Sequence, residues 1–239
     1  MRIERGKVRF PVVHIDTGYK FPEIYSFRDR HAKRWNLNLI IARNKQADED
    51  HITHERGTFA CCQARKTEAL KMVAAENGFD ALLVGIRRDE HGIRGKERYF
   101  SPRDTNGRWN VSREKSGGDA RLEALQDTEL AGWNLFATNF GDKTDHIRVH
   151  PLLHWTEQDI WEYIKLENIP LPRLYFAKNN KRYRSIGCEC CCSPIGSSAS
   201  NVDEVINELH DRRDKERDGR AQDKEDEHVM EKLRSLGYM

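Results

Sequence analysis

The sequence predicts an α/β fold in which a mostly parallel sheet is flanked by helices. Apolar strand-like runs alternate with amphipathic helical stretches as far as residue 167, and the run A-L-L-V-G-I at 81–86 is apolar throughout. Strands that alternate with helices form parallel sheets, because each helix carries the chain back to the edge where the next strand begins. A continuously apolar strand is typical of a parallel sheet that is covered on both faces.

Each element of this fold has its own local signals. Strands are expected over 10–16, 37–42, 81–86 and 147–152. Helices are expected over 22–36, 62–77, 156–167, 202–218 and 223–236. Pro22 suits a first helical turn, and Gly78 can end a helix. Thr156 followed by Asp159 is the pattern of a capping box.

Two polar stretches interrupt this alternation. Residues 43–58 are predicted to be a loop, and residues 87–146 form a long polar excursion. Structureless loops of that length are unusual in compact domains, so we expect short helices and an active-site role there. We expect a nucleotide-binding α/β core over 1–170 and a cysteine-bearing helical region over 171–239 that folds back over the site.

Composition narrows the class of protein. The 239 residues include 41 Lys or Arg and 39 Asp or Glu, a net charge of +2, which does not argue for a nucleic-acid partner. No apolar run approaches the roughly 20 residues of a membrane span, and the first ten residues do not resemble a signal peptide. We therefore expect a cytoplasmic protein. Residues 202–239 carry a net charge of −4, which leaves +6 on residues 1–201. This mildly basic body fits a phosphate-bearing or sulfate-like ligand, and a solvated surface explains it equally well.

Polar clusters follow three of the expected strands. Asp16-Thr17-Gly18, Arg87-Arg88-Asp89-Glu90 and His154-Trp155 would all lie at carboxyl ends of strands, where open α/β sheets bind ligands. Arg87 and Arg88 could clamp a phosphate or sulfate through bidentate hydrogen bonds. Ion pairs with the two following carboxylates are an equally good interpretation. His14, inside an apolar run, is better explained as a hydrogen-bonded core residue.

Several longer motifs resemble the small, catalytic subunit of bacterial ATP sulfurylase. They are V-V-H-I-D-T-G-Y-K-F-P-E, G-x-R-R-D-E at 85–90, K-E-R at 96–98, S-P-R-D at 101–104 and H-P-L-L-H-W-T-E-Q-D-I-W at 150–161. That family belongs to the adenine nucleotide α-hydrolases, together with phosphoadenylyl-sulfate and adenylyl-sulfate reductases. The resemblance implies adenylyl transfer from ATP, with Mg²⁺, to sulfate. It also implies a large GTPase partner subunit resembling an elongation factor, and hence an oligomer.

The same resemblance assigns site residues. Asp16, Thr17 and Gly18 would lie near the nucleotide, and Arg87 and Arg88 would hold phosphate or sulfate oxygens. Three further basic residues would serve the pocket, namely Lys66, Arg98 and Arg103.

One element of the family pattern has no counterpart at its expected place. The phosphate-binding loop S-G-G-x-D-S should precede residue 10, and the stretch at 116–119 matches it in letters only. Such a loop cradles the β- and γ-phosphates with backbone N–H groups. We therefore expect that ATP turnover by this chain alone is impaired.

The cysteines resemble a different branch of the superfamily. C-C-Q-A-R-K at 61–66 and S-I-G-C-E-C-C at 185–191 are similar to the iron–sulfur signature of adenylyl-sulfate reductases. The resemblance implies a 4Fe–4S cluster on Cys61, Cys62, Cys188 and Cys191. Zinc on the same thiols and unligated cysteines are the alternatives. Two more cysteines, at 190 and 192, leave the register of the second pair ambiguous.

The cysteine signature raises two alternative functions. A reductase that releases sulfite from adenylyl sulfate would need a C-terminal nucleophilic cysteine, and the last cysteine here is Cys192. A non-catalytic protein that binds sulfonucleotides would retain Arg87 and Arg88 and use the charged C-terminal helices for docking. Alternating charges on helices usually mark a solvated face, which is the simpler explanation of those helices.

Overall fold

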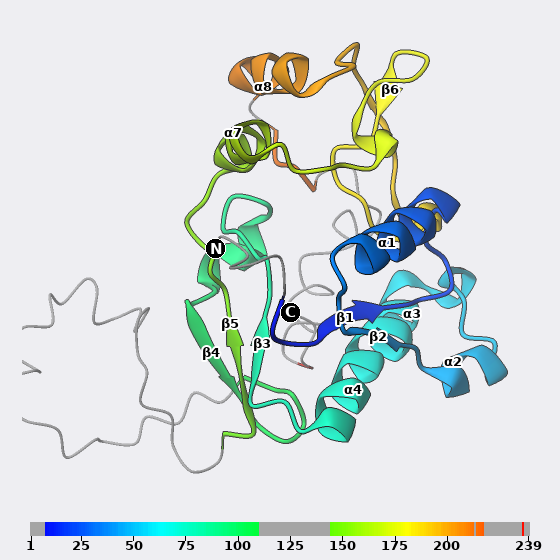
Figure 1. Cartoon of the computed structure of the whole chain (residues 1–239). Coiled ribbons are helices and arrows are strands. Elements are labelled where there is room, and N and C mark those ends of the chain that lie inside the picture. Colours follow the sequence, from blue (N-terminus) through cyan, green and yellow to red (C-terminus); the bar gives the residue numbers. More distant parts are fainter. Residues whose placement is uncertain (1–7, 110–143, 213, 218–235, 237–239) are drawn as a thin grey trace, which may run out of the picture.

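A computed structural model describes residues 8–109, 144–212, 214–217 and 236 (Figure 1). Among these residues, no helix combines the length and the apolar character that crossing a membrane requires. The chain is α/β, but its strands lie in three small sheets rather than in one. The prediction of an α/β fold is therefore confirmed, and that of a single sheet is wrong for the described residues.

The first sheet is a parallel pair. β1 (Val12–Ile15) and β2 (Leu39–Ala42) pair in register Val12 to Leu39, and α1 (Pro22–Arg34) connects them. Pro22 occupies the first turn of α1 as predicted, where its missing N–H leaves no helical hydrogen bond unmade. This βαβ unit places the turn after β1 at the carboxyl edge of the sheet.

A series of short helices follows β2. The interpretation of 43–58 as a loop is wrong, because α2 (Lys45–Glu49) forms there, with the Asn44 side chain accepting a hydrogen bond from the N–H of Ala47. α3 (Thr58–Cys62) then passes through a π-helical stretch, Gln63–Glu68, into α4 (Ala69–Asn77). Gly78 ends α4 with φ +60°, as its position predicts.

The second sheet has the order β3-β5-β4. β3 (Ala81–Leu83) is parallel to β5 (His146–Val149), and β4 (Phe100–Arg103) is antiparallel to β5. A strand was not expected inside the polar excursion, but β4 forms there, and its residues Ser101, Pro102 and Arg103 are all buried. A 3₁₀ turn over Gly92–Lys96 agrees with the expected short helices, while residues 110–143 lie outside the described part of the chain.

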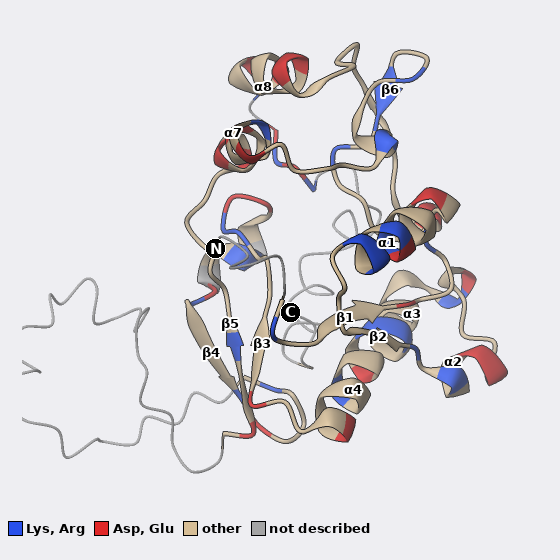
Figure 2. Ribbon diagram, viewed as in Figure 1, with Lys and Arg blue, Asp and Glu red and all other residues tan. Residues whose placement is uncertain are grey.

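The last region packs two helices together. α7 (Glu157–Glu167) begins with the predicted Thr156–Asp159 capping box, and α8 (Val202–Asp211) crosses it. Their shared core contains Trp161, Ala199, Val205 and Leu209. α8 is shorter than the predicted 202–218, and the helix expected over 223–236 falls almost entirely outside the described residues. The two-residue strands β6 (Lys181–Arg182) and β7 (Ile195–Gly196) form the third sheet. Figure 2 shows acidic residues on α7 and α8, and basic residues on α1.

Candidate functional site

The turn after β1 is held in one conformation by its own side chains. Asp16 Oδ1 accepts hydrogen bonds from the Gly18 N–H at 2.8 Å and from the Tyr25 hydroxyl at 2.7 Å. Burial alone would raise the pKa of Asp16, but these two bonds and Arg43 outweigh it and lower the pKa overall. Gly18 has φ +78°, and a Cβ there would lie 3.1 Å from Arg43 Nη2. The turn therefore needs glycine at this position.

Thr17 connects this turn to the cysteine-bearing region. It is 1% exposed, and its Oγ1 lies 3.2 Å from Cys188 Sγ. Its carbonyl accepts a hydrogen bond from Arg65 Nη1 at 3.1 Å, and the same guanidinium atom lies 2.5 Å from Asp48 Oδ1. The backbone of the turn is thereby fixed between α2, the π-helical stretch and the cysteine segment.

The cysteines predicted to bind a metal gather beside this turn. Cys61, Cys62, Cys188 and Cys191 are all buried, whereas Cys190 is exposed. The hydrogen bond from Cys191 lowers the pKa of Cys188, and Lys66 and Lys20 lower it further. Burial raises the pKa of Cys61 to about 11, with the charges of Cys62 and Cys188 adding to the effect.

This gathering is not a metal-ligand arrangement as it stands. In the described part of the chain, no three His, Cys, Asp or Glu side chains are placed to hold one metal ion. The donor chemistry of four buried thiols suits a cluster or zinc, but their present geometry gives neither.

The loop after β3 carries the two predicted arginines, and Arg87 is engaged by carboxylates. Its Nε lies 3.0 Å from Asp89 Oδ1, and its Nη2 lies 2.5 Å from Glu216 Oε2. Glu90 Oε1 accepts a hydrogen bond from the Arg87 N–H at 3.1 Å. Burial alone would lower the pKa of Arg87, but the three carboxylates, led by Glu216, raise it overall. The ion-pair interpretation of Arg87 thus describes this structure.

Arg88 has different surroundings. Its Nη2 donates to the carbonyl of Glu97 at 2.7 Å, and its Nη1 lies 3.3 Å from His154 Nε2. His154 Nδ1 in turn lies 2.6 Å from the Tyr99 hydroxyl. The predicted strand-end residues Arg88 and His154 are therefore neighbours, although their positions in the sequence are far apart.

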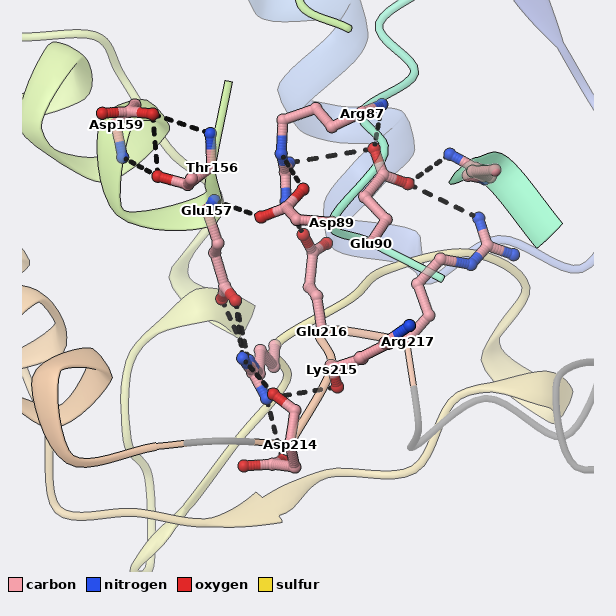
Figure 3. A network of polar contacts seen from close by, with 12 residues as sticks. Arg87, Asp89, Glu90, Thr156, Glu157, Asp159, Asp214, Lys215, Glu216 and Arg217 are labelled. Atoms are coloured by element: carbon pink, nitrogen blue, oxygen red, sulfur yellow. Dashed lines mark hydrogen bonds and ion pairs between the residues drawn. The ribbon is translucent and has the colours of Figure 1, made fainter. Parts of the chain in front are cut away.

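A segment near the C-terminus closes over this loop. Figure 3 shows Asp214–Arg217, hereafter the C-terminal segment, lying against Arg87 and Glu90. Arg217 Nη1 lies 3.9 Å from Glu90 Oε2, and Arg94 also pairs with Glu90. Burial, together with the neighbouring charge of Glu216, raises the pKa of Glu90, while its arginine partners oppose the shift.

Arg184 joins the C-terminal segment to the start of α7. Its Nη2 and Nε lie 2.7 Å and 3.0 Å from Glu157 Oε2, and its Nη1 lies 2.8 Å from Asp214 Oδ2. The Glu157 N–H donates to Asp89 Oδ2 at 2.6 Å, which ties α7 to the arginine loop. Sequence reasoning missed Arg184, Glu157 and Glu216, because no local pattern marks residues that pair over such separations.

The other two predicted arginines lie around β4 and not in this network. The Arg98 guanidinium stacks over the ring of Trp109, 4.8 Å from its centroid. Arg103, on β4, is 1% exposed, with Nη2 4.0 Å from Glu97 Oε2. His14 is half-buried, and its Nε2 has no hydrogen-bond partner in the described structure, so the hydrogen bond expected for it is missing at that atom.

The fold and these clusters define an α/β protein with candidate anion-binding residues at the carboxyl ends of parallel strands. Residues 2–194 match the model of the phosphoadenosine phosphosulfate reductase domain family. The chain belongs to that family and, within it, groups with proteins named sulfate adenylyltransferase subunit 2.

Two such relatives cover nearly the whole chain. The protein of Sulfurovum sp. (strain NBC37-1) is 34% identical over 98% of this chain and 82% of its own length. That of Myxococcus xanthus (strain DK1622) is 36% identical over 96% of this chain and 80% of its own length.

Solved structures are more distant. Phosphoadenylyl-sulfate reductase from Candida auris, solved as a phosphate complex, gives a TM-score of 0.47 at 19% identity, covering 77% of this chain and 72% of that one. FMN adenylyltransferase from Candida glabrata, solved with FMN and an ATP analogue, gives a TM-score of 0.49 at 17% identity. The match covers 96% of this chain and 63% of that one.

Proposed function

We propose that this chain transfers the adenylyl group of ATP to sulfate, giving adenylyl sulfate and pyrophosphate, as the small subunit of a sulfate adenylyltransferase. The observation that carries the proposal is the match over 96–98% of the chain to relatives of that name. In this reaction a sulfate oxygen attacks the α-phosphorus of ATP. The bond from that phosphorus to the bridging oxygen breaks, and pyrophosphate leaves with its electron pair.

The reaction would take place at the carboxyl ends of β1 and β3, in an adenine nucleotide α-hydrolase-like fold. Negative charge gathers around the α-phosphorus during the attack, so fixed donors and cations are required there. We assign the Asp16–Gly18 turn and Lys66 to the nucleotide, and Arg87 and Arg88 to phosphate or sulfate oxygens. ATP would enter as its Mg²⁺ complex, which neutralises part of the triphosphate charge. Arg98 and Arg103 would support the pocket from β4.

The contacts of Arg87 add a condition to this assignment. Glu216 Oε2 lies 2.5 Å from Arg87 Nη2, where an oxygen of an anionic substrate would bind. Phosphate or sulfate oxygens form the same charge-assisted hydrogen bonds with guanidinium as a carboxylate does. Substrate would therefore have to displace Glu216 to reach Arg87.

The test is sulfate-dependent release of pyrophosphate from ATP. The relatives' name, subunit 2, supports a partner subunit, and the motif resemblance implies a large GTPase, so the assay combines this chain with such a subunit and GTP. We expect pyrophosphate release only when both sulfate and this chain are present. Sulfite release from adenylyl sulfate would instead favour a reductase. Adenylyl-sulfate binding without either reaction would favour a non-catalytic sulfonucleotide-binding protein.

We also propose a metal centre on Cys61, Cys62, Cys188 and Cys191, supported by the burial of these four thiols and by the hydrogen bond between Cys188 and Cys191. Because the described side chains do not form a ligand set as they stand, binding would require these thiols to move together. Anaerobically purified protein is expected to contain about four iron atoms and four acid-labile sulfides per chain. Cys188→Ser should remove most of the iron, whereas Cys190→Ser, at the exposed position, should retain it. A content of one zinc and no iron per chain would mean that these cysteines form a zinc site and not a cluster. Protein without metal would overturn the proposal.

A further inference from the structure

Two connections of the second sheet meet around Arg88. β3 and β5 are parallel neighbours, so the stretches that leave their carboxyl ends begin side by side. The connection from β3 to β4, residues 84–99, carries Arg88, and the connection from β5 to α7, residues 150–156, carries His154 (Figure 1). The Arg88 N–H donates to the carbonyl of Leu153 at 3.0 Å, which fixes one connection against the other.

The Arg88 guanidinium is held at both of its terminal nitrogens. Nη2 donates to the backbone carbonyl of Glu97 at 2.7 Å, and Nη1 lies 3.3 Å from His154 Nε2. Arg88 is half-buried and His154 is exposed, so this pair lies where a ligand from solvent can reach it. Because a guanidinium is planar and rigid, a contact at each end fixes its plane as well as its direction.

The contact with Arg88 determines which ring nitrogen of His154 carries the proton. Every N–H group of a guanidinium is a donor, so His154 Nε2 has to accept, and the proton of the neutral imidazole then lies on Nδ1. Nδ1 lies 2.6 Å from the Tyr99 hydroxyl oxygen and therefore donates to it. This tautomer is assigned from the hydrogen-bond network. The contacts thus form a chain from Tyr99 through His154 to Arg88.

Tyr99 gives the imidazole a firm support. The rings of Tyr99 and His154 also pack against each other, with centroids 5.1 Å apart and planes inclined by 56°. The Tyr99 carbonyl accepts a hydrogen bond from the His150 N–H at 2.9 Å, which continues the pairing of β4 with β5 beyond Phe100 and Val149. His154 is therefore oriented by a residue whose backbone is part of the sheet edge, although its own ring is exposed.

We propose that His154 is a positioning residue for the anion that Arg88 binds, a role that rests on the proposed function. Two oxygens of a phosphate or sulfate group accept hydrogen bonds from one guanidinium only when the guanidinium faces them. Without the His154 imidazole, Nη1 loses this contact and the Arg88 side chain can adopt further orientations. Binding an anion then has to restrict that motion, which lowers the affinity.

Direct contact with the substrate is the other role that a histidine at this place could have. The assigned tautomer opposes it, because Nε2 turns its lone pair toward Arg88 and the Nδ1–H points to Tyr99. Neither ring nitrogen of His154 then presents an N–H group to an anion. The neutral ring is suited to holding the guanidinium and not to binding oxygens itself.

The first test is a double-mutant cycle on the binding of adenylyl sulfate, measured by isothermal titration calorimetry. We expect His154→Ala to weaken binding about fivefold, the effect of losing one hydrogen bond. Adding His154→Ala to Arg88→Ala should cause no further loss, because the residue through which His154 acts is absent. Tyr99→Phe, which removes only the hydroxyl, should weaken binding in the wild type and not in Arg88→Ala.

Two further variants serve as the rescue and the control. His154→Gln can place its side-chain oxygen near the position of Nε2, so it should bind adenylyl sulfate within about twofold of the wild type. His210→Ala removes another exposed histidine, on α8, and should also stay within about twofold. Urea denaturation checks that every variant folds.

The second test needs no ligand. Nuclear magnetic resonance of the isotope-labelled chain at about pH 8, where imidazoles are ordinarily neutral, reports the protonation of each ring nitrogen. The signals of His154 are those that His154→Gln removes. We expect a protonated Nδ1 and an unprotonated Nε2.

Four results would overturn the proposal. They are wild-type affinity in His154→Ala, the same loss from His154→Ala with and without Arg88, no rescue by glutamine, and the opposite tautomer. Adenylyl transfer is judged separately, by pyrophosphate release. If that reaction were absent and the cycle came out as expected, the proposed function would fail and the role of His154 would stand. If the wild type did not bind adenylyl sulfate, both would fail.

Discussion

Replacing Arg184 with methionine is expected to lower the free energy of unfolding by about 3–5 kcal/mol, the range found when one partner of a buried ion pair is removed. The Arg184 and Glu157 side chains are 6% and 10% exposed, and three hydrogen bonds of 2.7–3.0 Å join them. Without the guanidinium, the Glu157 carboxylate stays buried with no cation in its place. The loss should appear as a lower urea midpoint with an unchanged slope.

Two control variants separate this effect from a general loss of side-chain packing. Arg173→Met changes an exposed arginine and should alter stability by no more than about 0.5 kcal/mol. Adding Glu157→Gln to Arg184→Met removes the unpaired charge and should restore part of the lost stability. If Arg184→Met were as mild as Arg173→Met, the ion pair would not be a stabilising element of the fold.

Replacing Arg88 with alanine is expected to weaken adenylyl-sulfate binding about 10- to 100-fold, which corresponds to the loss of a charge-assisted hydrogen bond or two. Arg88 is chosen because it lies at the carboxyl end of β3, and its contacts with the Glu97 carbonyl and His154 fix the direction of its guanidinium. Isothermal titration calorimetry of the chain with adenylyl sulfate measures the change.

The matched control for this variant is Arg56→Ala, which removes an arginine from an exposed position before α3. It should leave the affinity within about twofold, because a solvated surface charge adds little to binding at a distance. Equal affinities for the wild type and Arg88→Ala would exclude Arg88 from the binding site.

Local patterns in the sequence predicted most of the elements correctly. The apolar runs marked β1, β2 and β5, Pro22 and Gly78 marked helix ends, and Thr156 with Asp159 marked the start of α7. Each of these signals depends on residues within one or two helical turns or within one strand. Because each signal arises from residues that are close together in the chain, it can be recognised in a single sequence.

The pairing of distant residues could not be predicted in the same way. That Glu216 reaches Arg87 and that Cys188 reaches Thr17 depends on how whole elements pack, and neither contact leaves a spacing that can be recognised. The expectation of one continuous sheet failed for a similar reason. Alternation of strands and helices indicates which strands are parallel, but not whether every neighbouring position is occupied.

The short stretch from Arg184 to Cys188 ties two polar networks to one piece of backbone. Arg184 is held by Glu157 and the C-terminal segment, and Cys188 touches the turn that contains Thr17. With only three residues between them, a shift at one end displaces the other. Thermodynamic linkage then requires reciprocity: a ligand on the thiols that favours one position of the C-terminal segment is itself bound more tightly when that segment takes the position. We therefore expect that a ligand on the cysteines changes how readily anions reach Arg87, and that an anion bound at Arg87 changes how tightly the cysteines hold their ligand.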